Sequence, residues 1–452
     1  MKRVACLLLL SGMVYFLPLP EGGSVMQGID PSQLRLGLGL FVCIAFLWMT
    51  EALPLSITAL LVPVLAAVMG LSDMKTSLSS FANPLIFVFF GGFALASALT
   101  AQGLDRWLAS WLSSLGKGKF LYSAIGFFVG TAFISMWMSN TATTAMMLPL
   151  ALGMLSRFKA REIHPGNTAF LLLGLAYSAS IGGLGTIVGS PPNGIAAKQL
   201  GIGFSEWIMF GVPAVAVLLP AMIGLLWLIL KPVNVVLDRS EISEEKFVFN
   251  SRRWLTLAIF GCTALAWMFG SQLESLLGIG ETDAWVALLA ACAVVSCKAV
   301  SWKQVQDNTD WGVLFLFGGG LALSAVLGES GASLFMARLL GATLEAWPLW
   351  AMIAAVVCFV IFIGELTSNT ASAALLVPIF FTMATEFDLP ANQLVLPLAL
   401  ATSCSFMLPV GTPPNAIVFG TGQVPQRTMM RVGFYLNMIF VILITALSLL
   451  LF

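Results

Sequence analysis

The sequence has 452 residues, of which 59% are hydrophobic and 9% charged, and its mean hydropathy is +0.97. These values lie far outside soluble composition and indicate a polytopic membrane protein. The 21 Lys and Arg residues balance the 21 Asp and Glu residues, so no net charge would recruit nucleic acid. The seven cysteines form no CxxC pair and His164 is the only histidine, which argues against a zinc site, a disulfide framework and much enzyme chemistry.

Apolar segments recur along the chain. The first follows Met1, Lys2 and Arg3 and extends to residue 19, which fits either a short first span or a cleaved signal sequence. With it, about eleven spanning helices are expected, the others near residues 35–50, 53–71, 83–102, 166–200, 205–230, 254–270, 284–300, 311–328, 392–423 and 429–452.

Two longer apolar blocks cannot be single spans. Residues 120–156 carry no charge, and as one straight helix they would reach about 55 Å across a hydrocarbon core of about 30 Å. Because its flanks are basic, this block is predicted to be a re-entrant hairpin at about 119–157 that enters from the cytoplasm. The block at about 345–386 has acidic flanks and one internal charge, Glu365. It is predicted to be a second hairpin that enters from outside.

Assigning the loops alternately to the two sides tests this topology. Arg35, Lys75, Lys198 and Arg338 fall outside, and every other Lys and Arg falls inside, as the positive-inside rule requires. The assignment predicts a cytoplasmic N-terminus and an external C-terminus. It also predicts two halves, 1–230 and 254–452, joined by a cytoplasmic connector at 231–253.

Three short motifs occur twice in the same order. Ser-Asn-Thr-Ala at 139–142 recurs at 368–371, Gly-Ser-Pro-Pro-Asn at 189–193 matches Gly-Thr-Pro-Pro-Asn at 411–415, and Phe-Gly-Gly at 90–92 recurs at 317–319. Since the two hairpins enter from opposite sides, the halves form an inverted repeat, as in many secondary transporters. The expected fold class is an all-α polytopic membrane protein with two re-entrant helical hairpins. The glycine pairs are interpreted as packing surfaces.

The Ser-Asn-Thr tips lie midway along their apolar blocks, where a polar turn is tolerated only inside protein or beside a wet cavity. These residue types favour helix N-caps, so each tip is expected to begin the returning helix and to point its positive dipole end at the bilayer middle. Such termini suit an anion. The Pro-Pro-Asn breaks are expected to free backbone carbonyls, which suit a cation.

Neither the tips nor the breaks contain Lys, Arg or His. A bound dianion would therefore need helix termini, hydroxyl and amide donors, and co-bound cations, because unpaired burial of its charge is prohibitive. Na+ fits the oxygen donors, whereas proton coupling usually needs an intramembrane carboxylate or histidine. Glu365 is the candidate for such a relay, and a structural or gating role is the competing interpretation.

The doubled Ser-Asn-Thr tip, each copy followed by a Pro-Pro-Asn break, resembles the divalent anion:sodium symporter family and its INDY-type bacterial dicarboxylate transporters over essentially the whole chain. The resemblance implies a homodimer in the bacterial inner membrane, with a scaffold and a moving transport part in each protomer. It implies import of a C4-dicarboxylate (succinate, malate or fumarate) with Na+ by an elevator motion. No enzymatic activity is implied, and no cofactor besides Na+ as coupling ion.

The family pattern also implies the site residues. The substrate contacts would be Asn140, Thr141, Ser190, Pro191, Ser368, Asn369, Thr370, Thr412 and Pro413. The first Na+ site would use Ser135, Ser139, Asn140 and Gly189, and the second Gly364, Ser368, Asn369 and Gly411. The chain departs from the pattern at Gly364, which has no hydroxyl where Ser135 supplies one, so its backbone carbonyl would have to serve.

Three other functions remain open. A transporter of sulfate or of a tricarboxylate such as citrate fits the same features, because helix termini recognise charge more sharply than carbon skeleton. A membrane hydrolase with Ser139 or Ser368 as nucleophile lacks an adjacent base and a GxSxG motif. A channel would not accumulate substrate against its gradient.

Overall fold

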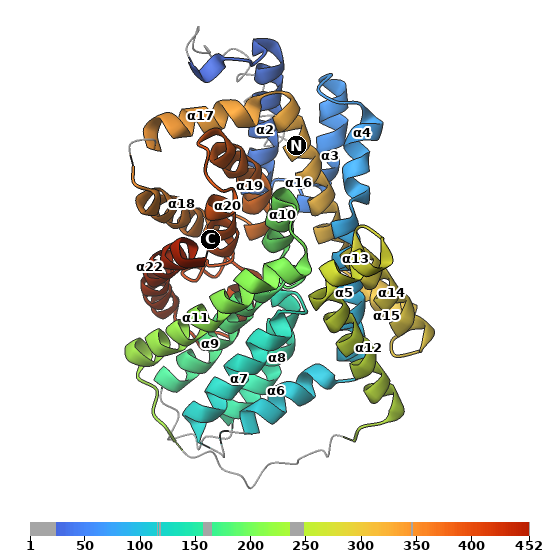
Figure 1. Ribbon diagram of the computed structural model, residues 1–452. Coiled ribbons are helices and arrows are strands. Elements are labelled where there is room, and N and C mark those ends of the chain that lie inside the picture. Colours follow the sequence, from blue (N-terminus) through green and yellow to red (C-terminus); the bar gives the residue numbers. More distant parts are fainter. Residues whose placement is uncertain are drawn as a thin grey trace.

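The computed structural model describes residues 24–114, 116, 119–156, 165–235, 248–344 and 347–451. Within these ranges the chain is folded almost entirely into helices (Figure 1), which confirms the all-α fold class. The expected first span at 1–19, His164, and residues 236–247 of the expected connector lie outside the described residues.

The helices follow one another with short links. Those up to residue 230 are η1 (Ser24–Met26), α2 (Pro31–Thr50), α3 (Leu55–Val68), α4 (Met74–Ser79), η2 (Ser80–Ala82), α5 (Pro84–Ala101), α6 (Leu104–Ser114), α7 (Phe120–Ser135), α8 (Asn140–Ser156), α9 (Pro165–Gly182), η3 (Gly183–Gly185), α10 (Pro191–Leu200) and α11 (Phe204–Leu230). Those after residue 250 are α12 (Ser251–Met268), α13 (Gly270–Leu277), α14 (Thr282–Ser296), α15 (Trp302–Asn308), α16 (Trp311–Glu329), α17 (Ala332–Leu344), α18 (Leu349–Gly364), α19 (Asn369–Glu386), α20 (Asn392–Thr402), α21 (Pro413–Phe419) and α22 (Gln426–Leu451).

Only some of the expected spans form helices long enough to cross a membrane by themselves. Among the described residues, six helices are long and apolar enough to cross a membrane, and α12 with α13, bent by 78°, would make a seventh. Other expected spans are shorter apolar helices, among them α3, α14 and α20. The segments at 166–200 and 392–423 are each divided into two helices, because their Gly-rich and Pro-Pro stretches end one helix and begin the next.

One kind of helix crossing occurs twice, each time between a helix of one half and a helix of the other. Helix α5 packs on α14, and α16 packs on α3. A Cβ on Gly91 would lie 2.5 Å from the carbonyl oxygen of Ala287, and a Cβ on Gly319 would lie 2.6 Å from Cα of Ala59. Backbones approach this closely only where the residue has no side chain. The prediction that the glycine pairs are packing surfaces is therefore confirmed.

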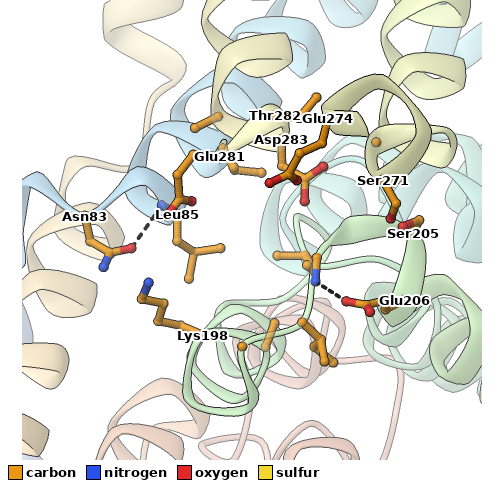
Figure 2. A pocket seen from close by; sticks show the side chains of 18 residues that line it. Asn83, Leu85, Lys198, Ser205, Glu206, Ser271, Glu274, Glu281, Thr282 and Asp283 are labelled. Atoms are coloured by element: carbon orange, nitrogen blue, oxygen red, sulfur yellow. Dashed lines mark hydrogen bonds between the residues drawn. The ribbon is translucent and has the colours of Figure 1, made fainter. Parts of the chain in front are cut away.

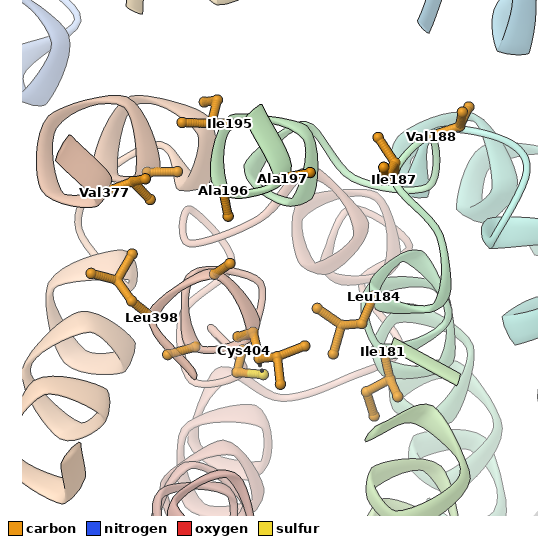
Figure 3. Packing of buried hydrophobic residues seen from close by; sticks show 14 of the residues in the cluster. Ile181, Leu184, Ile187, Val188, Ile195, Ala196, Ala197, Val377, Leu398 and Cys404 are labelled. Carbon is orange, nitrogen blue, oxygen red and sulfur yellow. Dashed lines mark hydrogen bonds between the residues drawn. The ribbon is translucent and has the colours of Figure 1, made fainter. Parts of the chain in front are cut away.

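The hairpin-bearing part, α7–α11 with α18–α22, has a core that interlocks the two halves. Helix α10 packs on α19 and α20, and α21 packs on α8 and α9. Figure 3 shows Ile195 and Ala196 of α10 beside Val377 of α19 and Leu398 of α20, and all four side chains are buried. Because close van der Waals packing holds membrane helices together, this exchange fixes each break against the hairpin of the other half.

Candidate functional site

Each hairpin turns at its Ser-Asn-Thr motif. Helix α7 ends at Ser135 and α8 begins at Asn140, while α18 ends at Gly364 and α19 begins at Asn369. In the first tip the backbone N–H of residue 142 donates to the Ser139 hydroxyl at 3.3 Å. In the second tip Ser368 has the extended backbone of an N-cap residue, but its side chain makes no cap hydrogen bond. The predicted start of the returning helix at each tip is thus confirmed.

The two breaks also begin helices. Ser190 and Thr412 have extended backbones, and the Pro-Pro pairs occupy the first turns of α10 and α21. Proline is well suited to this position because the first turn of a helix needs no backbone donor. The Thr412 hydroxyl accepts from the N–H of Asn415 at 3.4 Å. The prolines therefore initiate new helices, in addition to ending the old ones.

The asparagines of the breaks bind backbone. The Asn193 amide donates to the carbonyl oxygens of Gly183 at 2.8 Å and Thr186 at 2.7 Å. In the second half the Asn415 amide donates to the carbonyl oxygens of Ser405 and Leu408, both at 3.0 Å. Each asparagine is fully buried and holds the loop that precedes its own helix. The matching contacts establish that Gly183 and Ser405 are equivalent positions in the two halves.

A cavity of about 940 Å³ brings the tips and breaks together. Its volume lies within the range of small-molecule sites, about 300–1,000 Å³. Helices α8, α10, α19 and α21 all begin at its wall. The lining includes all of the substrate contacts expected from the sequence, namely Asn140, Thr141, Ser190, Pro191, Ser368, Asn369, Thr370, Thr412 and Pro413.

The charges around this cavity are unequal. Among the described residues that line it there is no Lys, Arg or His, so helix N-termini supply the positive potential. Part of the wall, from the end of α2 and the start of α16, is acidic and carries Glu51 and Asp310. Glu51 ends α2 with a left-handed backbone (φ 47°), and Asp310 caps α16 by accepting from the N–H of Val313 at 3.1 Å. An anion in this cavity would thus meet both helix N-termini and this acidic wall.

The expected cation donors lie around the tips. Ser139, Gly189 and Gly411 line the cavity, whereas Ser135 and Gly364 are buried and are not among its lining residues. The Ser135 hydroxyl lies 2.8 Å from Oδ1 of Asn140. Hard oxygen atoms of this kind suit an alkali cation, so the residues present fit Na+.

Glu365 binds the second break. Its carboxylate accepts from the backbone N–H groups of Met407 and Leu408, each at 2.9 Å, and from the Asn437 amide at 2.8 Å. In the first half, Thr186 forms the corresponding link by donating its hydroxyl to the carbonyl of Met136. The Glu365 carboxylate is therefore engaged in fastening tip to break, which favours the structural interpretation over the proton relay.

A second cavity of about 450 Å³ lies where the α10–α11 link meets α13 and α14 (Figure 2). The N–H of Gly203 donates to Glu206, and the N–H of Phe204 donates to Asp283, both at 2.7 Å. The described residues contain no group of acidic, histidine or cysteine side chains that could hold a metal ion. We interpret this region as a contact between the hairpin-bearing part and helices α12–α14.

Sequence reasoning missed three features of the main site. It did not anticipate the acidic wall, the backbone-holding role of Asn193 and Asn415, or the buried hydroxyl of Ser405 beside the second tip. The internal repeat could have signalled the asparagines, because both copies keep the residue. The wall carries no local signal, since Glu51 and Asp310 come from segments far from either motif.

Comparison with known proteins agrees with this geometry. Residues 45–401 match the citrate transporter family CitMHS. An uncharacterized transporter of Haemophilus influenzae is 50% identical, with 91% of this chain and 90% of that protein covered. The sodium-dependent dicarboxylate transporter SdcS of Staphylococcus saprophyticus is 33% identical, with 90% and 84% covered.

A solved structure shares the fold. The YdaH transporter of Alcanivorax borkumensis superimposes with a TM-score of 0.57 and 16% identity, and the match covers 82% of this chain and 86% of that one. The resemblance to the divalent anion:sodium symporters is confirmed by these relatives. The chain belongs to the CitMHS family and is a multi-pass membrane transporter, not an enzyme.

Proposed function

We propose that this protein is a secondary active transporter that imports a C4-dicarboxylate together with Na+. The observation that carries the proposal is the single cavity lined by both Ser-Asn-Thr tips and both Pro-Pro breaks. A dicarboxylate there would meet four helix N-termini and amide and hydroxyl donors, but no basic side chain. Co-bound Na+ would offset the remaining negative charge and the acidic wall.

The substrate contacts and the two Na+ sites expected from the sequence are part of this proposal. Two Na+ ions would lie beside the tips, one near Asn140 and one near Asn369, and the cargo between them. Because each cation reduces the electrostatic cost of burying the dianion, Na+ and cargo would bind cooperatively. The sodium dependence named for the SdcS relatives supports this coupling.

Alternating access would come from an elevator motion. In this proposal the hairpin-bearing part carries the cavity across the membrane against scaffold helices α2–α5 and α12–α16. The repeated glycine crossings, α5 on α14 and α16 on α3, support the scaffold assignment because they join these four helices closely to one another. A homodimer in the bacterial inner membrane, with the N-terminus cytoplasmic and the C-terminus external, completes the proposal.

Uptake into proteoliposomes tests the function. Purified protein should accumulate radiolabelled succinate when an inward Na+ gradient is imposed, and should lose accumulation when K+ replaces Na+ at equal ionic strength. Uptake that is equal in Na+ and K+ would refute the coupling. Saturation and accumulation against the gradient also separate a transporter from a channel.

A citrate transporter is the second candidate, and the matched family's description favours it. Competition against labelled succinate distinguishes the two cargos. A dicarboxylate carrier should be inhibited by malate and fumarate at concentrations where citrate and sulfate have little effect. The reverse order of inhibition would assign the tricarboxylate.

A further inference from the structure

The two tips place one hydroxyl differently. In the first half Ser135 carries a hydroxyl beside Asn140, whereas Gly183, in the loop that precedes the break, has no side chain. In the second half the arrangement is reversed. Gly364, the counterpart of Ser135, has no side chain, and Ser405, the counterpart of Gly183, carries the hydroxyl. Within this pair of equivalent positions each half therefore keeps a single hydroxyl, on the tip residue in the first half and on the loop residue before the break in the second.

Within each half, only one of the two paired positions has room for a side chain. A Cβ on Gly183 would lie 2.3 Å from Oδ1 of Asn140, and a Cβ on Gly364 would lie 2.6 Å from Oγ of Ser405. The Ser405 hydroxyl thus occupies the space that a side chain at position 364 would fill. The same Cβ position is 4.0 Å from Oδ1 of Asn369, so the hydroxyl and the amide oxygen both lie close to Gly364.

Both oxygen atoms are buried without partners. Ser405 is fully buried, and neither its Oγ nor Oδ1 of Asn369 has a hydrogen-bond partner among the described residues. In the first half, by contrast, Oδ1 of Asn140 is paired with Ser135. Buried oxygen atoms are rarely left unpaired, because desolvation without a partner is costly. Two such atoms beside one tip point to a cation as their common partner.

We propose that Ser405 supplies the hydroxyl ligand of the second Na+ site, in place of the side chain that Gly364 lacks. The inference rests on the proposed Na+ coupling and deepens it. The cation would be held by Oγ of Ser405, Oδ1 of Asn369 and backbone carbonyls, a set of hard oxygen donors suited to an alkali cation. Because Asn369 also lines the cargo cavity, the same cation would lie next to the bound dianion.

The test is Na+ binding to the purified full-length protein without cargo. Thermal unfolding in increasing NaCl, with choline chloride keeping ionic strength constant, gives an apparent Na+ affinity, and equilibrium binding of radioactive Na+ gives the number of ions. Ser405→Ala should weaken Na+ binding by about tenfold or more, because losing even a group that only supports a metal ligand typically costs about that much affinity. It should also remove one of the bound ions.

Two further variants separate ligation from packing. Ser405→Cys keeps the side-chain volume but replaces a hard oxygen with a soft sulfur, so it should fold with the wild-type Tm in choline and still lose Na+ affinity. Gly364→Ser combined with Ser405→Ala returns the hydroxyl to the position it has in the first half and should restore most of the affinity. Ser97→Ala is the control, because Ser97 is another buried hydroxyl without a partner among the described residues, on α5.

The outcomes are distinguishable. A wild-type protein whose Tm does not respond to Na+ would overturn the proposed coupling itself. A wild-type response that is retained unchanged in both Ser405→Ala and Ser405→Cys would overturn the role of Ser405 and leave the coupling intact.

Discussion

At the scale of single residues, the two break asparagines have a role that their motif does not reveal. Pro-Pro-Asn in a membrane segment suggests a ligand, yet the amide groups of Asn193 and Asn415 are used to hold carbonyl groups of the preceding loops. Removing either amide leaves two buried carbonyls without their donor, which costs roughly 1–3 kcal/mol.

Replacing Asn193 or Asn415 by Ala should therefore lower the Tm of the purified protein even when no cargo or Na+ is present. A ligand would behave differently, because its loss would affect the Tm only when cargo or Na+ is added. Thermal unfolding with and without succinate and Na+ checks this. An unchanged Tm in their absence would contradict this structural role of the two asparagines.

Residue roles could be predicted from the sequence only where the motif itself makes the contact. Asn140 and Asn369 begin the returning helices because Ser-Asn-Thr interrupts an apolar run, and that signal is local. Ser405 gave no such signal, because its significance comes from the missing side chain at Gly364, far away in sequence. Contacts of this kind depend on tertiary packing, which a repeat of short motifs does not specify.

At the scale of helices, the two glycine crossings set the spacing of the scaffold. Gly91 and Gly319 each meet a neighbouring backbone more closely than a Cβ allows. Gly91→Ala or Gly319→Ala should therefore force the helices apart and destabilise the protein by roughly 1–3 kcal/mol, the usual cost of overpacking.

Gly224→Ala is the matched control for this prediction, because Gly224 lies inside α11 with nothing near its added Cβ. Alanine there should be neutral or slightly stabilising, since it favours a helix over glycine. Thermal unfolding of the three variants decides. Equal Tm values for Gly91→Ala and Gly224→Ala would show that the crossing tolerates separation.

The presence of apolar helices was predictable from composition, but their lengths were not. The uninterrupted runs at α11 and α22 appear as long helices, as expected. The runs at 166–200 and 392–423 looked continuous in hydropathy but are divided at their breaks. Hydropathy averages over a window, so it does not detect a few extended residues between two apolar helices.

At the scale of the whole molecule, an aromatic contact joins the proposed moving part to the proposed scaffold. The ring of Phe204, at the start of α11, stacks on Trp267 of α12 with centroids 4.6 Å apart. The ring of Trp137, in the first tip, lies beside both, 6.1 Å from Phe204 and 6.4 Å from Trp267. An elevator motion would have to separate these rings.

Cross-linking this contact tests the motion. In a variant that lacks the seven native cysteines, Phe204→Cys with Trp267→Cys should be bridged by a bis-methanethiosulfonate, which spans the space left by the two rings, and the bridge should block succinate uptake until reductant removes it. Each single cysteine variant is the control for loss of the aromatic ring. Full uptake in the completely cross-linked protein would contradict a movement between these two parts.

The central claim is that both tips form one Na+-dependent site for a dianion, and direct succinate binding to purified protein tests it most directly. We expect saturable binding to the wild type in Na+, no binding when K+ replaces Na+, and loss of binding in both Asn140→Ala and Asn369→Ala while each variant remains folded. Wild-type affinity in either variant, or equal binding in K+, would contradict the account.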